Sequence, residues 1–236
     1  MGSALLKGVI RSGVLEPSNI YIFDVDFSKS DALAKETGVK ISKNNKELVK
    51  LCDYIILAVK PIYIKQVLED IKDTFTNGKV LVSIAAGVAS KTIKSVLGEN
   101  RKVVRAMPNL PALVGEGMTL VCFDNNLSDS ERAFVKRLFE VAGRVDELEE
   151  RLMCEGTALT GSSPAYVFML IEAMADSAVL QGIPRKAAYT MASQAVFGSA
   201  KMVLETGVHP AQLKDQVCSP AGTTIEAVQS LEKNGF

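Results

Sequence analysis

Short apolar runs rich in isoleucine and valine alternate with helical patterns between residues 3 and 107. The runs are NIYIFD, VKI, DYIILAV, KVLVSIA and KVVRAM. This alternation predicts βαβ units around a parallel sheet, the core of an α/β fold. Strands covered on both faces are continuously apolar, and residues 54–59 and 80–86 fit that expectation.

The same region extends to about residue 148. Strand candidates at 118–122 and 144–148 flank a helix that begins with Ser128, and Glu131 three residues later completes a capping-box pattern. From residue 149 onward the pattern is almost entirely helical, with long stretches at 163–181 and 184–206. We therefore predict an α/β domain over residues 1–148 and an all-α domain over residues 149–236.

The helical pattern at 163–181 is apolar over most of its circumference. A surface helix is not apolar all round, so this helix needs cover on nearly every side, and few other helices remain to provide it. A homodimer that buries the helices of two copies together is the expected solution, with a central helix of a monomeric bundle as the alternative.

Composition narrows the class of partner. The 27 basic and 27 acidic residues give no net charge, which disfavours nucleic acid or an anionic membrane as a partner and leaves small molecules and protein copies. The four cysteines are widely spaced and form no metal or disulfide pattern, and no signal segment precedes the first domain, so we expect a cytoplasmic protein with reduced thiols.

The single histidine, His209, precedes Pro210 at a helix entrance, where a structural or capping role is expected rather than a catalytic or metal-binding one.

Features of a dinucleotide-binding domain occur near the start of the sequence. Gly2 and Ser3 stand where the last glycine of a Gly-x-Gly-x-x-Gly turn would open the first helix, while the strand and glycines before it are missing. Asp24 follows the predicted strand at 20–23 about 20 residues later, where an acid can hydrogen-bond a ribose 2′-hydroxyl and favour NAD over NADP. An ordinary turn aspartate, together with Asp26, is an equally good interpretation.

Two further strand ends carry candidate ligand contacts. Ala58-Val59-Lys60-Pro61 follows one strand, at the edge where open α/β sheets bind ligands, and Lys60 is either a surface charge or a cation that faces the cleft. Small residues at 83–87 end the next strand and permit close approach of a nicotinamide ring to the backbone.

The stretch VCSPAGTTIEAV at 217–228 places small and hydroxyl residues before a helix. Free backbone N–H groups and the helix dipole can hold a carboxylate there. A common loop with a threonine N-cap explains the same composition.

Read together, these stretches resemble the pyrroline-5-carboxylate reductase family. The matching blocks are MGSALLKGV, AVKP, SIAAG, RAMPNLPALVGEG, LTGSSPAYVFMLIEAMAD, QGIPR, GSAKMVLETGVHPAQLKDQVCSPAGTTIEAV and LEKNGF, in the order of the family and across nearly the whole chain. The resemblance implies a Rossmann-type domain, an all-α dimerisation domain, NADPH or NADH as cofactor, and hydride transfer to a cyclic imine.

The resemblance also assigns roles by position. Predicted cofactor contacts are Gly2, Ser3, Asp24, Asn45, Ala58, Val59, Lys60, Pro61, Ala85, Ala86, Gly87 and Gln216. Predicted substrate contacts are Glu150, Ser219, Pro220, Ala221, Gly222, Thr223 and Thr224, with Thr224 and Lys60 as candidate catalytic residues and no metal. Loop amides would fix the carboxylate, and the Thr224 hydroxyl would hydrogen-bond the ring nitrogen.

Some positions depart from the family pattern. The glycine-rich strand before Met1 and an arginine-containing helix after Phe236 are absent, Ala221 replaces a frequent glycine, and Cys218 replaces a frequent serine or threonine. The missing strand predicts weak dinucleotide binding by this chain, so a non-catalytic dimerisation fragment is one alternative. A hydroxyacid-type dehydrogenase is another, although the lysine it requires is absent from residues 163–181.

Overall fold

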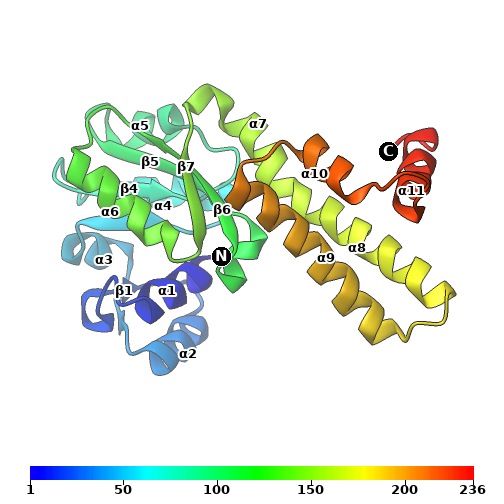
Figure 1. The fold of residues 1–236 in the computed structure, drawn as a ribbon. Coiled ribbons are helices and arrows are strands. Elements are labelled where there is room, and N and C mark those ends of the chain that lie inside the picture. The colour runs from blue at the N-terminus through cyan, green and yellow to red at the C-terminus, as the bar shows by residue number, and fades with distance from the viewer. The chain divides into compact units, whose positions relative to one another are not determined.

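The computed structural model describes residues 1–236 and divides them into two compact units, Met1–Pro164 and Ala165–Phe236 (Figure 1). The first unit holds all seven strands and the second is helical. An α/β domain followed by an all-α domain is therefore confirmed as the fold class. The domain boundary after residue 148 stays a prediction.

The elements of the first unit alternate as the sequence predicts. Its strands are β1 (Tyr21–Ile22), β2 (Lys40–Ile41), β3 (Tyr54–Leu57), β4 (Val80–Ser83), β5 (Lys102–Met107), β6 (Gly117–Phe123) and β7 (Gly143–Glu147). Its helices are α1 (Gly2–Arg11), α2 (Phe27–Thr37), α3 (Asn45–Leu51), α4 (Ile64–Ile71), α5 (Ser90–Leu97), α6 (Asp129–Glu140) and α7 (Met153–Thr157). A π-helical turn, Ala158–Ser162, follows α7. The Ser128–Glu131 capping box opens α6 as predicted.

The strands form two separate sheets. β3, β4 and β5 are parallel neighbours, β6 is antiparallel to β5, and β7 is parallel to β6. β1 and β2 form a parallel pair of their own. In a doubly wound fold the first strand lies between the strands that correspond here to β1 and β3. In this structure no strand joins β1 to β3, so the sheet is divided at that position.

The break changes the burial of β3. All four residues of β4 are buried, whereas Ile56 of β3 is 37% exposed between the buried Ile55 and Leu57. The expectation of continuous burial over residues 54–59 is therefore wrong, because β3 has a strand neighbour on one side only.

Both faces of the five-stranded sheet are covered by helices. On one face, Ile55 and Leu81 pack among residues of α3, α4 and α5. On the other face, Val80 and Val82 pack among residues of α1 and α6. Successive side chains of a strand point to opposite faces, so β4 contributes to both clusters and is apolar from Val80 to Val82.

The second unit contains most of α8 (Ser163–Leu180), together with α9 (Arg185–Thr206), α10 (Pro210–Val217) and α11 (Thr223–Lys233). Its buried core is small and consists of Ala175, Ala188 and Ala192, with partly buried neighbours such as Ile171. His209 is the N-cap of α10, and its Nδ1 accepts a hydrogen bond from the Ala211 N–H at 3.2 Å. The predicted capping role of His209 is confirmed.

Large apolar side chains of α8 and α9 remain exposed, including Phe168, Met169, Met191 and Phe197. The helix Glu150–Leu180 is long and apolar enough to cross a membrane by length and composition alone, and 6% of its apolar window is buried within the chain. Core helices of soluble proteins meet the same criterion. The apolar surface therefore needs cover from outside this chain.

Candidate active site

The predicted cofactor residues of the first unit lie where parallel strands end. Ala58 to Pro61 follow β3, and Ala85 to Gly87 follow β4, so both segments lie at the same edge of the sheet. A Cβ atom added to Gly2 would lie 3.0 Å from the Cβ of Ala58, which places the beginning of α1 against the end of β3. The structure thus brings Gly2 and Ala58 together, as a shared cofactor site requires.

The beginning of α1 fits the phosphates of a dinucleotide. Met1 is the N-cap and supplies no side-chain hydrogen bond, so α1 has no side-chain cap to compete with a ligand for its first N–H groups. Gly2 and Ser3 are the first two residues of this helix, and free N–H groups at a helix start bind phosphate together with the helix dipole. These residues therefore fit the cofactor that the sequence predicts.

Lys60 is exposed and forms no ion pair. Its backbone is extended, and it is the N-cap of the short 3-10 helix Pro61–Tyr63. Both interpretations of Lys60 remain open, and its catalytic role stays a prediction.

The segment after β1 is organised by its own acidic side chains. The Asp24 Oδ1 accepts a hydrogen bond from the Asp26 N–H at 2.9 Å, as in a turn. Asp26 is the N-cap of α2: its Oδ1 accepts from the Ser28 N–H, and its Oδ2 lies 3.4 Å from the Lys29 Nζ. The turn role of Asp24 is therefore real, and it leaves the Asp24 Oδ2 free for a ribose hydroxyl.

Asn45 is the first residue of α3. Its amide nitrogen donates to the Asp70 Oδ2 at 3.1 Å, a contact with α4. The side-chain oxygen of Asn45 has no partner within the protein, so that oxygen and the second N–H of the amide are available to a cofactor.

An ion pair between the buried Arg105 and the half-buried Glu150 lies beside the loop that follows β4. The Glu150 Oε1 accepts from the Arg105 Nη1 at 2.8 Å and from the Ser90 N–H at 2.7 Å. Arg105 lies on β5 and is 9% exposed. Burial acts to raise the pKa of the Glu150 carboxyl, but the hydrogen bond from Ser90 and the Arg105 guanidinium outweigh it and hold that pKa below its usual value.

The sequence interpretation missed Arg105. A charged residue inside the apolar strand run KVVRAM was the available signal, because a buried guanidinium needs a partner. The contact of Glu150 with the substrate stays a prediction, and the structure gives its carboxylate two partners within the protein.

A cavity of about 200 Å³ adjoins this ion pair. It is lined by residues of the β4 and β5 ends and of α7: Ala85, Gly87, Arg105, Ala106, Met107, Met153, Cys154 and Thr157. Two predicted cofactor residues, Ala85 and Gly87, thus face the same space as Arg105. Ala86, between them, is exposed.

The predicted substrate loop belongs to the second unit. The N-cap of α11 is Gly222, which supplies no side-chain cap, so the alternative explanation of this loop by a threonine N-cap is wrong. The first-turn N–H groups of Thr223 and Thr224 are therefore open to a ligand. Ala221 has a φ of 56° and the Gly222 N–H donates to the Ser219 carbonyl at 3.1 Å, which closes the loop into a tight turn.

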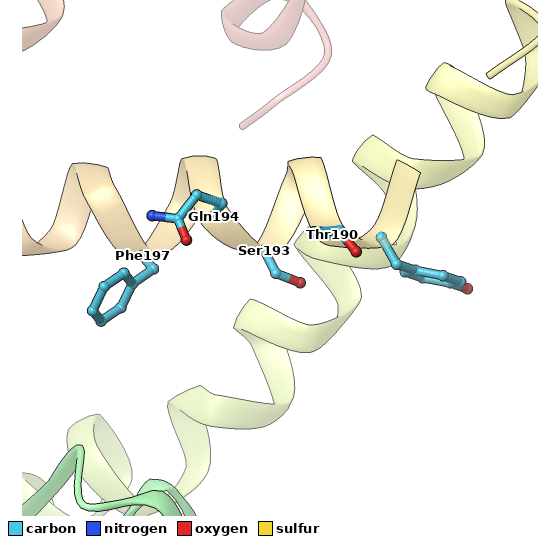
Figure 2. Close-up of a pocket in the computed structure, with 5 residues that line it drawn as sticks. Thr190, Ser193, Gln194 and Phe197 are labelled. Atoms are coloured by element: carbon cyan, nitrogen blue, oxygen red, sulfur yellow. The ribbon is translucent and has the colours of Figure 1, made fainter. Parts of the chain in front are cut away.

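Two other features of the second unit are less informative. Gln216 is exposed on α10, and its cofactor role stays a prediction. An open hollow on α9 is lined by Tyr189, Thr190, Ser193, Gln194 and Phe197, which project from one helix (Figure 2). Because a single helix lines it and no predicted site residue does, this hollow is surface relief rather than an enclosed site.

Comparison with known proteins connects both units to one family. Residues 150–236 match the model of the pyrroline-5-carboxylate reductase dimerisation domain. The pyrroline-5-carboxylate reductase of Escherichia coli (strain K12) is 47% identical over 236 residues, which are 100% of this chain and 88% of that protein. This chain belongs to the pyrroline-5-carboxylate reductase family.

Other comparisons agree with membership of the pyrroline-5-carboxylate reductase family. Residues 1–87 match the model "NADP oxidoreductase coenzyme F420-dependent", and together with the relatives this match makes the chain an oxidoreductase. The structure of a Coxiella burnetii pyrroline-5-carboxylate reductase has a TM-score of 0.92 and 32% identity, covering 99% of this chain and 87% of that one. The Plasmodium falciparum pyrroline carboxylate reductase with NADP bound has a TM-score of 0.87 and 34% identity. The match covers 100% of this chain and 87% of that one.

Proposed function

We propose that this protein reduces the cyclic imine of 1-pyrroline-5-carboxylate to L-proline, with NADPH or NADH as the hydride donor. The observation that carries the proposal is the 47% identity to the Escherichia coli pyrroline-5-carboxylate reductase over the full length of this chain. The reaction adds a hydride to the imine carbon, while the ring nitrogen of the protonated imine keeps its proton and becomes an amine. The protein then has to bind the two reactants and align them.

The cofactor half of the proposal is supported by the edge of the five-stranded sheet. The uncapped start of α1 suits the pyrophosphate, and the loops after β3 and β4 lie at the edge where such sheets bind ligands. A relative of the same family has been solved with NADP bound. The nicotinamide cofactor supplies the hydride when it is bound.

The substrate half is supported by the entrance of α11. A carboxylate near Thr223 and Thr224 can accept hydrogen bonds from backbone N–H groups that no side chain caps, and the positive end of the helix dipole favours its charge. The Thr224 hydroxyl can hydrogen-bond the ring nitrogen and hold the proton there, which keeps the imine reactive toward hydride.

The test is oxidation of NADPH or NADH on addition of 1-pyrroline-5-carboxylate, followed by absorbance, for the parent chain and two variants. Thr224→Val removes the hydroxyl and keeps the shape, so it should lower kcat/KM by about 10²-fold. Thr224→Ser keeps the hydroxyl and should stay near the parent. Unchanged catalytic efficiency in Thr224→Val would rule out this role.

A dimerisation fragment without activity is a second candidate, favoured by the break in the sheet between β1 and β3. In a doubly wound fold the phosphate-binding turn follows a strand at the position between β1 and β3. Titration of the protein with NADH and NADPH, read by fluorescence, separates the two candidates. Saturable binding supports the enzyme, and its absence supports the fragment.

We further propose that the second unit forms a homodimer. Its exposed apolar residues lie on α8 and α9, including Phe168 and Met169, and the family model that matches this unit is a dimerisation domain. Phe168→Asp should produce monomers in sedimentation analysis, whereas Val114→Asp, at an exposed apolar residue of the first unit, should not. A parent chain that sediments as a monomer, or that stays in solution only with detergent, would contradict the dimer.

A further inference from the structure

The cavity beside the β4 loop carries a single charged group on an otherwise mostly apolar lining. Ala85, Ala106, Met107 and Met153 supply apolar surface, and Arg105 supplies the charge. At about 200 Å³ the cavity is smaller than the roughly 300–1,000 Å³ of sites that enclose a whole drug-sized ligand. It suits one ring of a larger molecule.

Arg105 has more hydrogen-bond donors than the protein uses. A guanidinium offers five N–H donors, and the only recorded bond of this one is from Nη1 to Glu150 at 2.8 Å. Its other N–H donors have no partner within the protein, and the side chain is 11% exposed, so a molecule that enters the cavity can reach the guanidinium. A ligand in the cavity that brings a hydrogen-bond acceptor would satisfy it.

The charge of the pair decides which kind of acceptor fits. Glu150 already neutralises Arg105, so the pair as a whole offers little attraction to a phosphate or a carboxylate. A neutral carbonyl oxygen can still accept from the remaining N–H groups, and an apolar lining suits the face of a flat ring. A carboxamide on an aromatic or dihydropyridine ring has both properties.

Glu150 also fixes the orientation of Arg105. The same Oε1 atom accepts from the Ser90 N–H, and Ser90 is the first residue of α5, whose N-cap Ala89 provides no side-chain cap. Glu150 therefore ties the guanidinium to the beginning of α5, just after the loop that contains Ala85 and Gly87.

We infer that this cavity receives the carboxamide end of the nicotinamide, with Arg105 donating to the carboxamide oxygen and Glu150 acting as the positioning residue for Arg105. The inference rests on the proposed function, because it takes a nicotinamide dinucleotide as the ligand. It adds a residue outside the predicted cofactor set.

The test compares two ligands that differ in the nicotinamide. NADH and ADP-ribose share the adenine, both riboses and the pyrophosphate, and ADP-ribose has no nicotinamide. Arg105→Met, which keeps an apolar stem of similar length, should weaken NADH binding by about 10- to 100-fold in calorimetric titration. ADP-ribose binding should stay at the level of the parent.

Glu150→Gln is the second variant. Its amide oxygen can still accept from Ser90, so the cap of α5 is kept while the charge that holds Arg105 is lost. NADH binding should weaken in the same direction but less than in Arg105→Met, and ADP-ribose binding should again be unchanged. Near-ultraviolet circular dichroism establishes that both variants keep the parental packing.

If Arg105→Met weakens the binding of NADH and ADP-ribose equally, or weakens neither, the inference is overturned while the proposed function stands. A parent chain that binds both ligands but does not reduce the imine defeats the proposed function alone. A parent that binds neither ligand overturns both. If Arg105→Met fails to fold, Glu150→Gln decides, and equal affinity of that variant and the parent for NADH counts against the inference.

Discussion

Two single substitutions in the substrate loop, Ala221→Gly and Gly222→Ala, should have opposite effects on stability. Ala221 is the one non-glycine residue with a positive φ, at 56°. Gly222 has ordinary angles, but a Cβ added to it would lie 3.1 Å from the Ser219 carbonyl oxygen and in steric conflict with the Ser219 Oγ. Ala221→Gly should therefore relax the loop, and Gly222→Ala should strain it.

The magnitudes follow from the backbone and the contacts. A left-handed conformation disfavours alanine by about 1–2 kcal/mol, and the greater freedom of glycine in the unfolded chain takes back about 0.4–1 kcal/mol. Ala221→Gly should thus stabilise the unit that contains it, Ala165–Phe236, by about 0.5–1 kcal/mol, or about 2–8 °C in Tm for a unit of that size. Crowding by the new methyl group of Gly222→Ala costs about 1–3 kcal/mol and the reduced freedom of the unfolded chain offsets about 0.4–1 kcal/mol, so a net loss of about 0.5–2 kcal/mol is expected.

Thermal unfolding and steady-state kinetics measure both changes. If the loop holds the substrate carboxylate, Gly222→Ala should also raise KM for 1-pyrroline-5-carboxylate by about tenfold, since each 1.4 kcal/mol of lost binding is about that factor. Ala221→Gly should leave KM unchanged or lower it. A lower Tm for Ala221→Gly together with a parental Tm and KM for Gly222→Ala would refute the loop geometry.

Three other predictions concern the first unit. Asp24→Ser removes a carboxylate that would repel a 2′-phosphate, so the ratio of the NADPH and NADH dissociation constants should shift toward NADPH by about tenfold in fluorescence titration. The pKa of Glu150 is lowered in the folded protein, so its carboxylate stabilises the fold above the unfolded pKa of about 4.3. That stability is lost as pH falls through the folded pKa. Urea unfolding of Glu150→Gln should therefore show a smaller loss of stability between about pH 5 and pH 3 than the parent shows. Gly143 has a φ of 137°, and Gly143→Ala places a methyl group against the backbone of Gly117. The free energy of unfolding, obtained from urea titration, should fall by about 3 kcal/mol or more. A fall below about 1 kcal/mol would show that β6 and β7 can separate to accept the methyl group.

Local sequence patterns were sufficient wherever neighbouring residues decide the structure. The capping box at Ser128 and the cap at His209 both occur as predicted, because a cap depends on residues within one turn. The helix predicted at 163–181 is α8, Ser163–Leu180, for the same reason.

Contacts between distant residues could not be predicted in this way. The pairing of Arg105 with Glu150 joins positions 45 apart, and no local period carries that information. The exposure of Ile56 depends on the position of β3 at the edge of its sheet, and the N-cap of α11 at Gly222 depends on the closure of the loop.

The sequence by itself therefore determined the order of strands and helices, the family, and the segments that should hold cofactor and substrate, because these follow from periodicity and from contiguous motifs. Only the tertiary structure decided that a break separates β1 from β3, that Glu150 is bound to Arg105 and Ser90, and that Arg105 faces a cavity with Ala85 and Gly87. Those features arise where chain folding brings remote residues into contact, and burial then determines which charges must be paired.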